Sequence, residues 1–252
     1  MKEARAGIAQ TVTEITMRLA SFSLIGALLV FASATPGRAF TDAELIDGFN
    51  RTVFGSEYQS FGWQSYLVKK YDGPVRLFVD DRSSIPRRHE IESFVRTLPG
   101  LIAGLDVSVV EDTKAANFHV FVIDRADYRG VVAKEIYGRP SSSFTPGKCL
   151  VRVVSTRSGI SRSDAVIVAD EGEFLLHRCM VEEILQGLGP INDDRTLSES
   201  VFNDTSHHSS FTSFDRHILN MLYHPLIEPG MTKLEAARVL PEVAADVQAR
   251  LR

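Results

Sequence analysis

The chain has 252 residues, with 28 Lys and Arg residues against 32 Asp and Glu residues, which gives a formal net charge of −4. A hydrophobic content of 44% with only 24% charged residues excludes an intrinsically disordered chain and is enough for a sizeable core. The near-neutral balance argues against a nucleic-acid-binding protein, which usually carries a basic face. Two cysteines are too few for a disulfide-framework mini-protein or a Cys-rich zinc module.

The first 39 residues have the pattern of a secretory signal peptide. An uncharged, mostly apolar run covers residues 19–34, and it is shorter than the about 20 residues that a membrane-spanning helix needs. Three basic residues precede it: Lys2, Arg5 and Arg18. Small-residue cleavage sites end at Ala34 and Ala39, and we favour Ala39 because Pro36 and Gly37 break the apolar helix just before it. An uncleaved N-terminal anchor is the alternative interpretation.

Removal of residues 1–39 changes the charge balance of the remaining chain. Four basic and two acidic residues are lost, which leaves 24 basic against 30 acidic residues, a net charge of −6 over 213 residues. We therefore expect a modestly acidic protein that is periplasmic or secreted. We expect no nucleic-acid partner and no membrane insertion after the signal is removed.

An N-terminal helical appendage is predicted over residues 40–73. Thr41 and Glu44 have the spacing of a capping box, and apolar residues follow at helical spacing through residue 54. The sequence Asp-Gly-Pro at residues 72–74 is a turn signal. This turn separates the appendage from the main domain, which we place at residues 74–225.

The main domain is predicted to hold a mixed sheet with helices packed on it, an α+β fold. The expected strands are short apolar runs that cover residues 75–79, 106–110, 118–123, 149–154 and 165–169. One helix is expected within residues 89–105, with Pro99 ending it early. Residues 124–147 contain several Gly, Pro and Ser residues and are interpreted as a surface loop.

A buried helix follows the last strand. Asp170 and Glu173 give a D-x-x-E start signal. From Phe174 to Gly189, apolar residues fall nearly all round the helix when they are placed at about 100° per residue, which is typical of a buried helix.

Three polar residues of this helix, Glu182, Glu183 and Gln186, lie on or beside one face. Burial of carboxylates costs several kcal/mol unless they are paired, metal-bound or protonated. The helix therefore either carries a buried polar network, with Arg178 or Arg152 as a partner, or lines a cleft.

The sequence E-E-x-x-Q-x-x-G-x-x-N over residues 182–192 resembles the H-E-x-x-H-x-x-G-x-x-H helix of metzincin zinc peptidases. In that motif two ligands at i and i+4 face the metal, and the Glu between them is the general base. Residues 214–223 are also similar to the D-x-x-x-L-x-x-L-Y helix that ends many metzincin domains. The resemblance implies a zincin-like α+β domain with a mixed sheet packed on a buried central helix.

The ligand positions depart from that motif, because Glu182, Gln186 and Asn192 stand where the histidines would be. A neutral amide oxygen is a weak zinc ligand, so this set suits a harder divalent cation better. The resemblance implies Glu183 as the candidate catalytic base. It implies Glu182, Gln186 and Asn192 as candidate metal ligands, with Asp193 as an alternative to Asn192. No cofactor is expected, unless it is a divalent metal ion.

Residues 226–252 are predicted to form a C-terminal helical tail. Thr232 and Glu235 have the spacing of a second capping box, and Pro241 is expected to open another helix. The motif at residues 182–192, together with the sequence L-Y-H-P…P-G-M from residue 222, also resembles an uncharacterised bacterial exported domain family of unknown function.

Cys149 begins a predicted strand, and Cys179 lies one turn before Glu182. Because an exported protein folds in an oxidising compartment, a disulfide between the two cysteines is the favoured interpretation, and two buried thiols are the alternative. By the chain-entropy model, a loop of about 30 residues would be stabilised by about 3–4 kcal/mol. The bridge would tie the sheet to the central helix.

The sequence leaves three functions open. The favoured hypothesis is a catalytically inactive, pseudo-peptidase scaffold that binds a peptide, a protein or a small ligand in the cell envelope. The second is a metal-dependent peptidase or other hydrolase with Glu183 as general base. The third is a purely structural component of the cell envelope.

Overall fold

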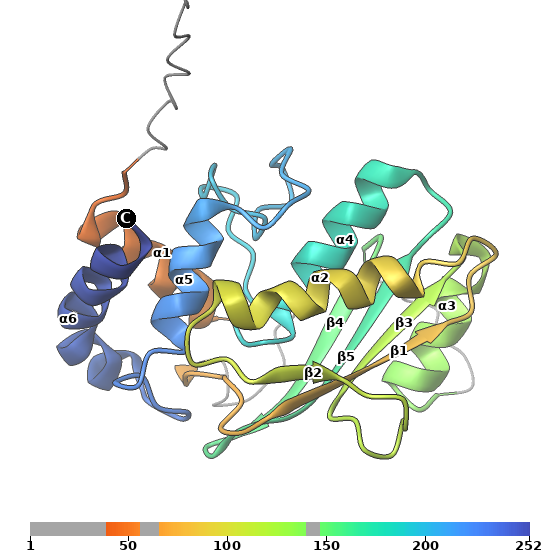
Figure 1. Cartoon of the computed structure of the whole chain (residues 1–252), viewed down its shortest axis with the longest axis horizontal. Coiled ribbons are helices and arrows are strands. Elements are labelled where there is room, and N and C mark those ends of the chain that lie inside the picture. The colour runs from red at the N-terminus through yellow and green to blue at the C-terminus, as the bar shows by residue number, and fades with distance from the viewer. Residues whose placement is uncertain (1–38, 56–65, 140–146) are drawn as a thin grey trace, which may run out of the picture. The chain divides into compact units, whose positions relative to one another are not determined.

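The fold is built on a five-stranded mixed sheet with the strand order β2-β1-β3-β5-β4 (Figure 1). The computed structural model describes residues 39–55, 66–139 and 147–252, so the predicted signal peptide lies outside the described residues apart from Ala39. The strands are β1 (Val75–Asp81), β2 (Val107–Val109), β3 (Phe118–Ile123), β4 (Leu150–Thr156) and β5 (Gly159–Val168). The pairs β1–β2, β1–β3 and β3–β5 are parallel, and β4 runs antiparallel to β5 at one edge. The α+β expectation is confirmed.

Strand β5 starts six residues before its predicted beginning at residue 165. Residues 159–164 lie outside the predicted strands, but they form a hairpin with β4 in which Thr156 pairs with Gly159. The polar residues of this segment hid the strand. Residues 159–162 pair with β4 alone, and only residues 165–168 of β5 read as continuously apolar.

Alternate residues of the central strands enter two separate cores. Phe118, Val120 and Val122 of β3 belong to the main core, beneath α2 (Arg88–Leu101) and α4 (Glu173–Gln186). Phe121 and Ile123 point to the other face and belong to a second, smaller core. Helices α2 and α4 therefore cover one face of the sheet (Figure 1).

The second core is closed by a helical segment where we expected a surface loop, so that prediction is wrong for residues 125–136. The segment consists of η2 (Arg125–Asp127), α3 (Tyr128–Val131) and the π-helical turn η3 (Val132–Ile136). Tyr128, Val132 and Ile136 are buried against β3 and β5. Residues 140–146 of the predicted loop lie outside the described residues.

Three helices form a layer beside the sheet: α1 (Asp42–Val53), α5 (Ser213–Leu222) and α6 (Lys233–Leu251) (Figure 1). Both predicted capping boxes are present, Thr41 with Glu44 and Thr232 with Glu235. Leu45 of α1 and Val243 of α6 belong to the same main core as the sheet residues. Residues 40–252 form one compact unit.

Two prolines lie inside helices, although we expected Pro99 to end its helix and Pro241 to open a new one. Helix α2 continues past Pro99 to Leu101, and α6 is one continuous helix with Pro241 inside it. Both prolines are exposed. A carbonyl that loses its helical N–H partner on an exposed face can bond to water instead, which reduces the cost of the interruption.

The start of α4 also differs from the prediction. Asp170 does not cap the helix; its carboxylate accepts the backbone N–H of Arg125 at 2.8 Å. The residue before the helix is Gly172, at φ +97°, and it makes no side-chain cap. In the part of the chain that the structure describes, no helix has both the length and the apolar character needed to cross a membrane.

Candidate ligand cavity on helix α4

Helix α4 presents three buried polar side chains on the face that the sequence indicated. Glu182 and Glu183 are each 5% exposed and Gln186 is 2% exposed. The helix ends against the sheet: a Cβ atom at Gly187 would lie 2.2 Å from the Phe118 ring, so only glycine permits this close packing on β3. The end of the helix is therefore fixed on β3 close to the three polar residues, since Gly187 lies next to Gln186 and four residues after Glu183.

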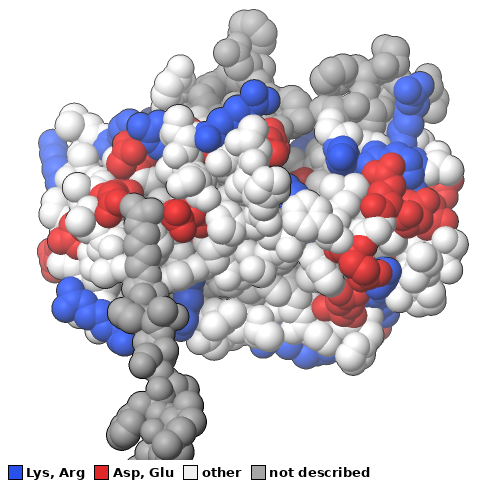
Figure 2. Space-filling view, turned by 90° about the horizontal axis from the view of Figure 1, so that it is seen from above, with Lys and Arg blue, Asp and Glu red and all other residues white. Residues whose placement is uncertain are grey.

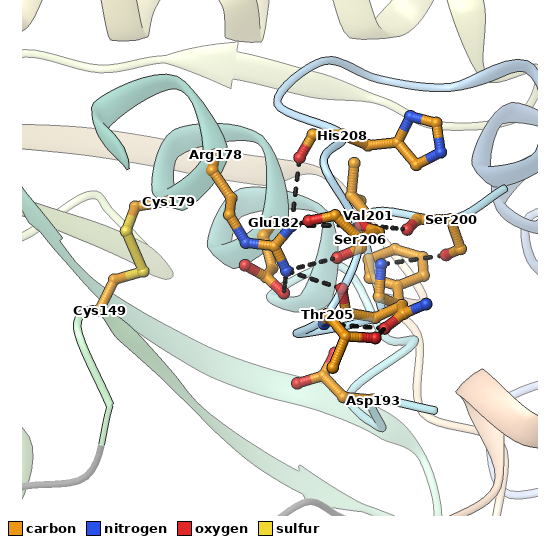
Figure 3. Close-up of polar contacts among 12 residues, drawn as sticks. Cys149, Arg178, Cys179, Glu182, Asp193, Ser200, Val201, Thr205, Ser206 and His208 are labelled. Carbon is orange, nitrogen blue, oxygen red and sulfur yellow. Dashed lines mark hydrogen bonds and ion pairs between the residues drawn. A yellow bond between two sulfur atoms is a disulfide. The ribbon is translucent and has the colours of Figure 1, made fainter. Parts of the chain in front are cut away.

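Arg178 is the ion-pair partner of Glu182, with 3.0 Å between Nη2 and Oε1 (Figure 3). The two side chains are only 9% and 7% exposed. The same guanidinium donates to four backbone carbonyls of the following loop, those of Val201, Asn203, Ser206 and His208, at 3.0–3.3 Å. Arg152, the other partner considered, donates instead to the carbonyl of Ile136.

Gln186 and Asn192, both predicted from the motif, lie in different environments. Gln186 Nε2 donates to Asp193 Oδ1 at 2.8 Å. Asn192 Nδ2 donates to the carbonyl of Arg51 at 2.7 Å, and the Asn192 side chain packs on Gly55. The structure therefore groups Asp193, rather than Asn192, with Gln186.

The motif glycine turns the chain at the end of α4. Gly189 has φ +142°, and a Cβ atom there would lie 2.1 Å from the carbonyl oxygen of Lys69. A side chain is excluded by both the backbone conformation and the contact. This turn directs residues 190–194 back beneath the polar face of the helix, which places Asp193 beside Gln186.

A cavity of about 1140 Å³ lies along this face of α4. The loop after α4 contributes Asp193, Asp204 and Ser206 to its wall, and the segment before β4 contributes Lys148 and Cys149. Phe174, which is 52% exposed, and Leu175 add apolar surface. Six acidic residues line the cavity, against Lys148 and Arg178 as the basic ones: Glu171, Glu173, Glu182, Glu183, Asp193 and Asp204. The lining is therefore acidic.

The structure contains the expected disulfide between Cys149 and Cys179, with Cα atoms 5.8 Å apart. Cys179 is fully buried in α4, and Cys149 lines the cavity at the entry to β4 (Figure 3). The bridge thus joins two walls of the cavity covalently, one residue away from Arg178.

The loop after α4 is anchored to α5 through a buried carboxylate. Asp215 accepts hydrogen bonds from the Ser200 hydroxyl, the Thr212 hydroxyl and the Val201 N–H. Burial is the main cause that raises the pKa of Asp215, and these hydrogen bonds oppose it. With Arg178 on one side and Asp215 on the other, the loop forms a fixed wall.

The predicted set Glu182, Gln186 and Asn192 does not fit zinc. Gln186 directs its amide nitrogen to Asp193, Asn192 is bound to Arg51, and neither residue offers imidazole or thiolate. A different set of oxygen atoms lies close together: Glu182, Asp193 and Asp204 each place one carboxylate oxygen within 4.8 Å of the others. Sequence reasoning missed Asp204, because it lies twelve residues beyond the motif in a loop rich in Ser and Thr.

The face of the molecule seen from above shows no comparable bias among the described residues (Figure 2). Figure 2 shows acidic and basic side chains interspersed over the face viewed from above, among the residues that the structure describes. A nucleic-acid-binding protein usually shows a basic stripe or patch, and this face gives no such indication.

Fold and site together define a class of protein: an α+β domain in which a disulfide-tethered, buried helix presents a polar face to an acidic cavity. Over residues 42–242 the chain matches the model of a family described as a protein of unknown function, DUF2927. The match covers most of the chain, so the chain belongs to this family, which fits the expectation of an uncharacterised family. No curated protein and no solved structure matches the chain.

Proposed function

We propose that this chain is an exported, zincin-like domain without catalytic zinc, which binds a peptide ligand in the cell envelope. One observation carries the proposal: both residues at the i and i+4 ligand positions are engaged by other side chains. Glu182 is neutralised by Arg178, and Gln186 turns its amide nitrogen toward Asp193. A metal ion at these positions would have to compete with a guanidinium and with an amide donor.

The chemistry of the cavity favours a basic peptide with an apolar side chain. Two of the six lining carboxylates are paired from outside the lining, Glu171 by Arg125 and Glu173 by Arg87. Six carboxylates against four basic groups still leave an excess of negative charge around a volume of about 1140 Å³. Phe174 offers an exposed ring at the same opening. Charge complementarity of this kind increases the rate and the specificity of binding, and salt weakens it.

Binding is tested with fluorescent peptides that carry Lys and an aromatic residue, and with the same peptides in which Glu replaces Lys. We expect the basic peptides to bind more tightly, and Asp204→Asn to weaken binding about two- to fivefold, as for removal of one partly exposed ion pair. Glu242→Gln removes an exposed charge on α6, outside the cavity lining, and serves as the control. Equal binding of acidic and basic peptides contradicts the proposed ligand class.

A second candidate function is a metal-dependent hydrolase with Glu183 as general base. The cluster of Glu182, Asp193 and Asp204 favours it, because three carboxylates suit a hard divalent cation better than zinc. Elemental analysis of the purified protein and peptide hydrolysis by wild type and Glu183→Gln decide between the two. Stoichiometric metal with activity that Glu183→Gln abolishes overturns the inactive scaffold.

Export is proposed from the sequence of residues 1–39. N-terminal sequencing of the protein from a periplasmic or secreted fraction is expected to begin at Phe40, or at Thr35 if Ala34 is the cleavage site. Recovery only in the membrane fraction, with Met1 retained, would support the uncleaved anchor instead.

A further inference from the structure

Cys149, Glu182 and Glu183 form a mixed group of sulfur and oxygen atoms in the cavity wall. Cys149 Sγ and one carboxylate oxygen from each glutamate lie within 4.8 Å of one another. Cys149 comes from the entry to β4, and both glutamates come from α4. The group differs from the set that the motif predicts, since neither Gln186 nor Asn192 belongs to it.

The disulfide controls the ligand character of this group. While Cys149 is bonded to Cys179, its sulfur is not a thiolate and is a poor metal ligand. Two carboxylates alone lack the thiolate or imidazole that zinc favours. Reduction by a dithiol transfers two electrons and two protons to the bridge, so that the S–S bond breaks, two thiols form and the dithiol becomes a disulfide.

We propose that this chain has a redox-gated zinc site, in which the Cys149 thiolate, Glu182 and Glu183 bind zinc only when the bridge is reduced. The Cys149 thiol gives up its proton when the metal binds. This inference does not rest on the peptide-binding proposal, and it assigns no catalytic step to the metal.

Charge balance favours metal binding in the reduced state. One thiolate and two carboxylates carry three negative charges, and Arg178 remains on Glu182 with one positive charge. A bound divalent ion brings the summed charge of these groups to zero. With the bridge closed, only two carboxylates and the guanidinium would surround the same ion. The summed charge would then be +1 in a largely buried site.

The geometry requires only a local adjustment. In a tetrahedral site with Zn–S of about 2.3 Å and Zn–O of about 2.0 Å, the ligand atoms lie about 3.3–3.5 Å apart. The three atoms lie within 4.8 Å of one another, so shifts of about 1 Å or less per side chain bring them to that spacing. Opening the S–S bond frees the Cys149 side chain to rotate, and the cavity gives the ion a path of entry.

The test uses the full mature chain, with Co²⁺ and Zn²⁺ as probes and a matched pair of cysteine variants. Wild type is reduced with a dithiol that is then removed under nitrogen. We expect one ion per chain, a cobalt–thiolate charge-transfer band in the near ultraviolet, and zinc affinity at least 100-fold higher than for oxidised wild type. Cys179→Ser leaves Cys149 free and is expected to bind zinc without reductant, whereas Cys149→Ser is expected not to bind in either condition.

Three results overturn the proposal. The first is equal zinc binding by Cys149→Ser and Cys179→Ser, and the second is a Cys179→Ser protein without the cobalt–thiolate band. The third is loss of cooperative unfolding in both reduced wild type and Cys179→Ser, because the site needs α4 folded against β4. Glu183→Gln keeps the bridge and the buried shape, and it is expected to lower the zinc affinity of the reduced protein about 10- to 100-fold.

Discussion

Replacing Arg178 by methionine tests how the loop after α4 is held. Arg178 and Glu182 form a largely buried ion pair, and Arg178 also donates to four loop carbonyls. Removing one partner of a buried pair costs about 3–5 kcal/mol, because the remaining charge loses its compensation. We expect a loss of this size in the free energy of unfolding, measured by urea denaturation, and faster amide hydrogen exchange in residues 201–208.

A double-mutant cycle separates the ion pair from the loop contacts. Glu182→Gln keeps an oxygen acceptor for Arg178 but removes the charge, so we expect a smaller loss of about 1–2 kcal/mol. The variant with both changes is expected to lose less than the sum of the single losses, by about 0.5–3 kcal/mol. A loss below about 1 kcal/mol for Arg178→Met, or strict additivity in the cycle, would show that this ion pair does not hold the loop.

Three further predictions concern stability, each measured by denaturant or thermal unfolding. Gly189→Ala is expected to cost about 1–3 kcal/mol or more, because of its positive φ and the Lys69 carbonyl 2.1 Å from the new Cβ. The control Gly130→Ala, with no atom within 4 Å of the new Cβ, should be neutral or stabilising by up to about 1 kcal/mol. Burial lowers the pKa of Lys69 and of Lys70 from 10.5 to about 8. Between these values the unfolded chain binds more protons, so stability should rise with pH, by up to about 1.4 kcal/mol per pH unit for each lysine. A slope that persists in Lys69→Met and Lys70→Met would assign it to other groups. Cys179→Ser is expected to cost about 3.5 kcal/mol by the chain-entropy model, and an unchanged unfolding midpoint would show that the bridge does not form.

The sequence predicted the elements whose signals lie within a few neighbouring residues. The strand at residues 118–123 was predicted with its observed limits, because a strand buried on both faces reads as a continuous apolar run. The capping boxes at Thr41 and Thr232 were predicted because a cap depends on residues three positions apart. For the polar face of α4 the sequence left two interpretations open, a buried network with Arg178 or Arg152 and a cleft, and the structure has both the Arg178–Glu182 pair and a cavity there.

The sequence did not predict features that depend on contacts between distant segments. The helical turns at residues 125–136 have Tyr128, Val132 and Ile136 four residues apart, a weak helical signal that the neighbouring Gly and Pro residues concealed. Asp170 has the right spacing for a cap, but the backbone of Arg125 takes its carboxylate. Asp204 joins the acidic group only because Arg178 and Asp215 fix the path of the loop.

The separation of the two cores has a consequence for how the domain opens. The second core contains few residues and, in the part of the chain that the structure describes, its helical cover comes from α3 and η3, whereas the buried apolar residues of α4 belong to the main core. Small packed units can unfold locally while the remainder stays native, with a lower free energy of opening than the global value. The amides of residues 128–136 should therefore exchange hydrogen ahead of those in α4, and the cavity should keep its shape while the far face of the sheet is briefly exposed to water.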